Sequence, residues 1–106
     1  MIQGISLDVS NISNKEDLFD LFSQTFGFPS YFGKNWDAFE EVLSGMNFEK
    51  ITGINITGIH LSCVGYDRFK INFPTGEREI FESILTDISA NSNQLSQSLL
   101  FTFEMK

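Results

Sequence analysis

The sequence has few of the residues on which small scaffolds and catalytic sites depend. Its single cysteine, Cys63, cannot form an internal disulfide, and its single histidine, His60, cannot form a histidine cluster for a metal ion or a proton relay. No apolar run approaches the ~20 residues of a membrane span, and the first ten residues lack the basic and apolar parts of a signal peptide. These absences exclude a disulfide scaffold, and we expect a cytoplasmic protein that binds no metal and no cofactor.

Basic residues are also scarce. Seven lysines and arginines stand against 14 aspartates and glutamates, which gives a formal net charge of −7. Residues 1–49 contain eight of the acids and only two lysines, so this half carries most of the net charge. An acidic half repels nucleic acid and anionic membranes and attracts basic partners, although solubility alone also accounts for such a charge.

The residues that are present indicate one small α/β domain over residues 1–106. Apolar residues make up 42% of the chain and include 12 phenylalanines, which predicts a single core with many aromatic rings. Strand signals occur in four segments, the third of them a short extra strand: 5–9, 51–61, 69–73 and 99–103. Two helices are expected between the first two strands, and a third begins at a Thr75 cap and ends before a turn at 91–93. This order predicts parallel strand pairs joined by right-handed crossovers.

Local signals set the bounds of the first two helices. Ser13 and Glu16 have the spacing of a capping box, in which the serine hydroxyl accepts from the third helical N–H and the glutamate reaches back. The helix that follows has a clear apolar stripe, which Phe19 does not fit. Asn35 is the expected N-cap of the second helix, and Gly45 is its expected end.

The second helix combines an apolar stripe with acidic residues on the other side. Asp37, Glu40 and Glu41 fall within a sector of roughly 100° on the helical wheel. Asp37 and Glu41 are one turn apart, and such a pair of like charges costs an isolated helix a few tenths of a kcal/mol, or about 0.2–0.5. A cationic partner would compensate this cost, and a solvated helix face is the alternative interpretation.

Nothing in the sequence requires an enzyme. The carboxylate pair of a glycosidase needs a sugar-binding cleft, and a convex helix face has the wrong shape for one. His60 and Cys63 are three residues apart in a predicted strand, so their side chains would project to opposite faces of the sheet. We therefore expect both to be structural.

Aromatic residues accompany the acidic helix. Tyr31 and Phe32 precede Gly33 in the connection before it, and Trp36 opens the helix itself. Aromatic side chains beside charge are typical of protein–protein hot spots. For Phe32 and Trp36 closure of the core is an equally good interpretation, and Tyr31 is the better candidate for exposure.

The segment 29–39, with the sequence Pro-Ser-Tyr-Phe-Gly-Lys-Asn-Trp-Asp-Ala-Phe, resembles the signature of the barstar family, the intracellular inhibitors of barnase-type ribonucleases. That signature has a proline, an aromatic pair, a glycine, an asparagine and then aspartate-alanine-leucine at this spacing. The order of elements is similar to the family's fold, a small three-stranded parallel sheet flanked by helices. The segment 62–73 does not resemble the family's short third helix.

The resemblance implies a binding surface. In the family this loop and helix plug the nuclease active site, and carboxylates take the place of substrate phosphates. Glu41 matches the family's most important aspartate, with one more methylene, and Glu40 replaces a tryptophan. The residues expected to bind the partner are Tyr31, Gly33, Asn35, Trp36, Asp37, Glu40, Glu41 and Asp87.

The resulting hypothesis is an inhibitor, acting as an immunity protein or antitoxin, that occludes the active site of a basic ribonuclease toxin. We expect it to be a monomer when free, to form a 1:1 heterodimer with the nuclease, and to bind neither nucleic acid nor membranes. The alternative is an acidic interaction module that regulates a non-toxin RNA-binding partner. The two hypotheses differ in whether the partner has a nuclease activity that this protein abolishes.

Overall fold

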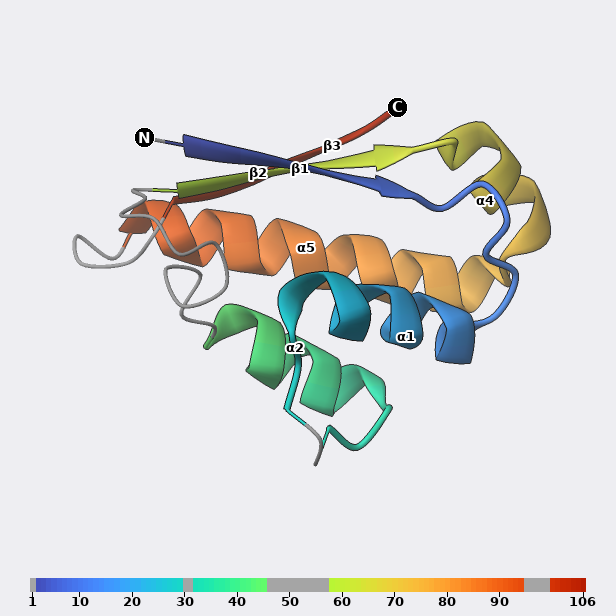
Figure 1. Ribbon diagram of the computed structural model, residues 1–106, viewed down its shortest axis with the longest axis horizontal. Coiled ribbons are helices and arrows are strands. Elements are labelled where there is room, and N and C mark those ends of the chain that lie inside the picture. Colours follow the sequence, from blue (N-terminus) through green and yellow to red (C-terminus); the bar gives the residue numbers. More distant parts are fainter. Residues whose placement is uncertain (1, 30–31, 46–57, 95–99) are drawn as a thin grey trace.

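The structure is a computed structural model that describes residues 2–29, 32–45, 58–94 and 100–106 (Figure 1). Within these residues, three strands and four helices follow one another. In order they are β1 (Ile2–Asp8), α1 (Lys15–Phe26), α2 (Trp36–Ser44), β2 (Gly58–Val64), α4 (Tyr66–Asn72), α5 (Thr75–Gln94) and β3 (Leu100–Met105).

The strands form one parallel sheet in the order β1-β2-β3. The register pairs Ile2 with Gly58 and Gly58 with Leu100, so β2 is the central strand. The predicted small parallel α/β sheet is confirmed. Figure 1 shows α1, α2 and α5 on one side of the sheet, and no helix of the described residues covers the other side.

The two faces of the sheet differ in chemistry, because successive side chains of a strand point to opposite sides. Ile59, Leu61 and Cys63 of β2 point toward the helices and are fully buried. Between them along the strand, His60 and Ser62 belong to the opposite face, so the prediction that His60 and Cys63 project to opposite sides is confirmed. Burial raises the pKa of the Cys63 thiol to about 12, which makes it an unreactive core residue.

The helix-free face carries a polar network centred on Glu104 of β3. Ser62 Oγ donates to Glu104 Oε1 at 3.2 Å, and His60 Nε2 and Lys106 Nζ lie 3.3 and 3.0 Å from the same oxygen. His60 Nδ1 lies 2.7 Å from the hydroxyl of Thr102. The hydrogen bond from Lys106, followed by that from His60, holds the pKa of the Glu104 carboxyl below its usual value.

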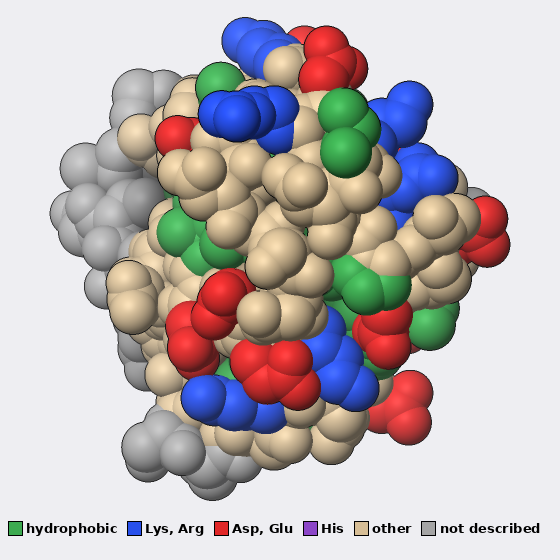
Figure 2. Space-filling model, turned by 90° about the vertical axis from the view of Figure 1, so that its right-hand side faces the viewer, with side chains coloured by type: hydrophobic (Ala, Val, Ile, Leu, Met, Phe, Trp, Pro, Cys, Tyr) green, Lys and Arg blue, Asp and Glu red, His purple; other side chains and the backbone are tan. Residues whose placement is uncertain are grey.

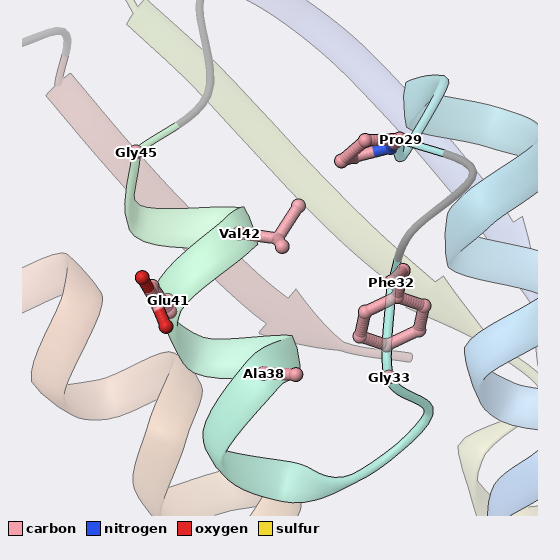
Figure 3. A pocket seen from close by; sticks show the side chains of 7 residues that line it. All are labelled: Pro29, Phe32, Gly33, Ala38, Glu41, Val42 and Gly45. Atoms are coloured by element: carbon pink, nitrogen blue, oxygen red, sulfur yellow. The ribbon is translucent and has the colours of Figure 1, made fainter.

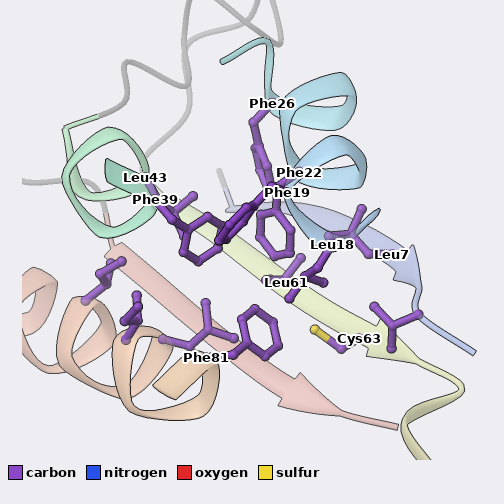
Figure 4. Close-up of a cluster of buried hydrophobic side chains, with 14 of the residues drawn as sticks. Leu7, Leu18, Phe19, Phe22, Phe26, Phe39, Leu43, Leu61, Cys63 and Phe81 are labelled. Atoms are coloured by element: carbon purple, nitrogen blue, oxygen red, sulfur yellow. The ribbon is translucent and has the colours of Figure 1, made fainter. Parts of the chain in front are cut away.

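Phenylalanine rings from three helices build the core between the sheet and α2 (Figure 4). Phe22 of α1 and Phe39 of α2 meet edge to face with centroids 4.9 Å apart, and Phe81 of α5 lies 5.8 Å from Phe22 and 6.1 Å from Phe39. All three side chains are fully buried. The predicted aromatic core is therefore the place where α1, α2 and α5 meet.

One expectation about α1 is wrong, and one residue that did not fit its pattern is explained. Its N-cap is Asn14, not Ser13: the Asn14 side-chain oxygen accepts from Asp17 N at 2.8 Å, one residue further along than the capping box predicted. Phe19, which did not fit the apolar stripe, is fully buried and packs on Phe39 at 5.5 Å. The reason is that α1 contacts α2 as well as the sheet, so its buried surface is wider than one stripe.

The segment 69–73 is not a strand. Its first four residues belong to α4, where Phe69 and Phe73 are buried and stack at 4.5 Å, while Ile71 is 82% exposed. A spacing of four residues fits both a strand and a helical turn, and here the helical turn buries the two rings. The short helix α4, which the sequence did not indicate, thus takes the place of the expected extra strand.

The remaining bounds differ in detail. α5 begins at Thr75 itself, because the Arg78 amide already donates to the Pro74 carbonyl at 2.8 Å, so Pro74 and not Thr75 occupies the cap position. The helix continues to Gln94, so the turn expected at 91–93 is wrong. The first part of the second predicted strand, residues 51–57, lies outside the described residues.

Candidate functional site

The loop before α2 and the two caps of that helix are built by local hydrogen bonds. The Asn35 side-chain oxygen accepts from Ala38 N at 2.8 Å, and its amide nitrogen donates to the Gly33 carbonyl at 3.4 Å. At the other end, Gly45 N donates to the Glu41 carbonyl at 3.1 Å. The predicted N-cap and C-terminal end of the second helix are confirmed, and Asn35 is shown to orient both the loop and the helix.

Lys34, directly before the cap, has φ 50°, a left-handed conformation that non-glycine residues adopt rarely. Its ammonium lies 3.0 Å from the Asp20 carboxylate of α1. The positive charge of this loop is thereby paired with α1 and not with the carboxylates of α2.

The carboxylates of Asp37, Glu40 and Glu41 form a surface that we call the acidic face. All three residues are exposed. Among the residues that the structure describes, no lysine, arginine or histidine lies within ion-pair distance of any of them, whereas Asp20, Glu77, Glu82 and Glu104 each have such a partner. The acidic face therefore keeps its charge available for a cation from outside the described chain.

A pocket of about 530 Å³ lies between α2 and the loop before it. Figure 3 shows Val42 and Ala38 of α2 on one side of it and Phe32 and Pro29 of the loop on the other, with Glu41 at its edge on the helix. Gly33 and Gly45 also line the pocket. The pocket is thus largely apolar and has one carboxylate beside it.

Behind the acidic face, Trp36 attaches α2 to its neighbours. Its half-buried ring meets Phe19 of α1 edge to face at 4.9 Å and Phe39 at 5.8 Å. The indole Nε1 donates to the carboxylate of Glu77 on α5. These contacts support the interpretation that Trp36 closes the core. The ring is nevertheless partly exposed, and the next residue in the chain is Asp37 of the acidic face.

The expected binding residues divide into three groups. Gly33, Asn35 and the acidic face lie together, exposed, on the loop and α2, with Trp36 half-buried at the start of the helix. Asp87 is exposed on α5. Tyr31 lies outside the described residues.

Sequence analysis missed two features of the site. The first is the apolar pocket, because no local pattern indicates that Val42 of α2 and Phe32 of the loop line one cavity. The second is Glu77, which is 41 residues away from Trp36 in the chain. Only the three-dimensional structure brings such pairs together.

The described part of the chain contains no group of three histidine, cysteine, aspartate or glutamate residues arranged to hold a metal ion. Within the same part, no helix has the length and apolarity needed to cross a membrane.

The chain matches a known protein family. A family model described as Barstar (barnase inhibitor) matches residues 2–104, which is nearly the whole chain. No curated protein matches the sequence.

Proposed function

Because the chain belongs to the barstar family of barnase-type ribonuclease inhibitors, we propose that it inhibits a basic ribonuclease by covering the active site of that enzyme with the acidic face. The observation that carries this proposal is the set of three exposed carboxylates on α2, Asp37, Glu40 and Glu41, with no cationic partner among the described residues. The expected residues Tyr31 and Asp87 remain part of the proposal.

The chemistry of a ribonuclease active site favours this arrangement. Such a site holds RNA phosphates with cationic side chains, and carboxylates accept the same charge-assisted hydrogen bonds. Trp36 and Phe39 pack on Phe19 of α1, which holds the backbone of α2 in place, so little backbone entropy is lost when the carboxylates bind. The carboxylates offer the enzyme no phosphodiester bond to cleave.

The pocket beside Glu41 supplies an apolar contact in the same surface. Its volume of about 530 Å³ is within the range of pockets that bury a ligand group. In the proposed complex, a side chain of the ribonuclease enters between Phe32 and Val42. Burial of that side chain and the charge pairs next to it together form the centre of the interface.

In its cellular role the protein acts as an immunity protein or antitoxin in the cytoplasm. The free chain is monomeric, and the complex contains one copy of each protein. It binds neither RNA nor membrane lipid, because its net charge of −7 repels the phosphates of both.

The test is inhibition of RNA cleavage by a panel of basic barnase-type ribonucleases, with a fluorogenic RNA substrate and titration to the equivalence point. Glu41→Gln and Asp37→Asn remove charge while keeping shape. Each should weaken binding to an inhibited ribonuclease by more than about 2 kcal/mol, which is roughly 30-fold in Kd.

Glu16→Gln is the matched control, because Glu16 is an exposed acid in the first turn of α1. Asp20 is unsuitable as a control, since its removal would free Lys34. An unchanged Kd for Glu41→Gln would refute the role of the acidic face. Binding to a basic protein without any nuclease activity would favour the alternative, an acidic module that regulates a non-toxin RNA-binding partner.

A further inference from the structure

One carboxylate, that of Glu77, contacts the first residues of two other helices. Glu77 is the third residue of α5. Its Oε2 accepts from the indole of Trp36, the first residue of α2, and its Oε1 lies 4.0 Å from the ammonium of Lys15, the first residue of α1. Figure 1 shows that α1, α2 and α5 all begin at the same end of the molecule, and Figure 2 views that end, where acidic and basic side chains lie next to one another.

The electrostatics of this position favour a carboxylate. A helix N-terminus carries a partial positive charge, and Glu77 lies in the first turn of its own helix while reaching toward the starts of two more. A half-buried indole N–H needs an acceptor, and an ionised acceptor makes a stronger hydrogen bond than a neutral one. Glu77 therefore fixes the ring of Trp36 from one side, while Phe19 and Phe39 pack against it from others.

We propose that Glu77 is a positioning residue for ribonuclease binding: it touches no partner, but by holding Trp36 it sets the orientation of α2 and hence of the acidic face. The inference rests on the proposed function. Asp37 follows Trp36 directly, and Glu40 and Glu41 lie on the next turn, so a tilt at Trp36 displaces all three carboxylates together. Charge-assisted contacts of this kind require placement to within about 0.5 Å.

The first experiment needs no partner, because Trp36 is the only tryptophan of the chain and its fluorescence reports on its surroundings directly. Glu77→Ala should shift the emission of Trp36 while the far-ultraviolet circular dichroism stays that of a folded protein. Glu77→Gln keeps an oxygen that accepts from the indole and should restore an emission close to that of the unsubstituted protein. Glu79→Ala, which removes an exposed acid two residues away on the same helix, should leave the emission unchanged.

The second experiment measures dissociation from a barnase-type ribonuclease that the unsubstituted chain inhibits. Glu77→Ala should raise the dissociation rate at least about tenfold, the factor that corresponds to the lower end of the range for a hydrogen bond to a charged group. Glu77→Gln should bring the dissociation rate most of the way back to that of the unsubstituted protein, and Glu79→Ala should leave the rate unchanged. Ile88→Val destabilises the far half of α5 without touching Trp36, so it should leave the rate unchanged and separates positioning from general stability.

Two results would overturn the inference. One is an emission and a dissociation rate for Glu77→Ala that match the unsubstituted protein. The other is an equal rise in dissociation for Ile88→Val at the same loss of stability, which would reduce Glu77 to a stabilising residue. If no ribonuclease binds the unsubstituted chain, the proposed function fails, and the emission data still decide whether Glu77 holds Trp36.

Discussion

Replacement of Phe19 tests the packing that supports α2. The ring is fully buried, and it meets Trp36 at 4.9 Å, Phe39 at 5.5 Å and Phe32 of the loop at 5.6 Å. Truncation of a buried phenylalanine to alanine costs about 3–5 kcal/mol, and each aromatic contact of this geometry contributes about 0.5–1.5 kcal/mol within that loss. We therefore expect Phe19→Ala to lower the free energy of unfolding by about 4 kcal/mol.

That loss is a large part of the roughly 5–15 kcal/mol that stabilises a domain, so a milder variant belongs beside it. Phe19→Leu keeps most of the apolar area and loses the edge-to-face contacts, which should cost about 1–2 kcal/mol. Urea unfolding followed by circular dichroism and by Trp36 emission measures both variants. The two probes should give the same transition midpoint.

Ile71→Ala is the control, because Ile71 is 82% exposed on α4. It should change the free energy of unfolding by less than about 0.5 kcal/mol. A cost for Phe19→Ala below about 1 kcal/mol would refute the reasoning, because α1 and α2 would then be held together without their shared ring.

Three further predictions follow from charge and burial. The association rate with the ribonuclease should fall steeply between about 0.05 and 0.5 M salt, while the dissociation rate changes little. Stopped-flow mixing measures both rates. An association rate that does not change with salt would mean that the acidic half serves only solubility. The thiol of Cys63, fully buried with its pKa raised to about 12, should react with a thiol reagent only after unfolding, so rapid labelling of the native protein would contradict its burial. The pKa of Glu104 is lowered in the folded protein, so its carboxylate stabilises the fold above the ordinary pKa of a glutamate. This contribution is lost as the pH falls through the lowered pKa. Glu104→Gln should therefore flatten the acid side of a plot of urea midpoint against pH.

The bounds of α2 were predictable because both of its caps are local. Asn35 bonds to an amide three residues away, and Gly45 bonds to a carbonyl four residues back, so the signal and the structure lie within one turn. The exposure of Asp37, Glu40 and Glu41 on one face was predictable for a similar reason, since helical periodicity alone places them together. The element order likewise sufficed for the parallel sheet.

The features that sequence analysis missed depend on contacts between distant segments. Phe69 and Phe73 suit either a strand or a helix, and only their burial against the core selects the helix. Phe19 lies off the stripe that faces the sheet because α2 provides a second surface to cover it. The hydrogen bond between Trp36 and Glu77 joins two helices whose packing no local pattern reports.

The position of α1 and α2 within the crossover from β1 to β2 has a consequence for the order in which the molecule assembles. β1 has no strand partner until Gly58–Val64 has been synthesised, and Phe81, which completes the rings behind α2, follows later still. Pairing across so long a loop is costly in entropy and slow compared with local contacts. An amino-terminal fragment that contains the entire acidic face is therefore expected to lack the support that holds it in place. A growing chain should acquire its binding surface only after the first part of α5, as far as Phe81, has left the ribosome.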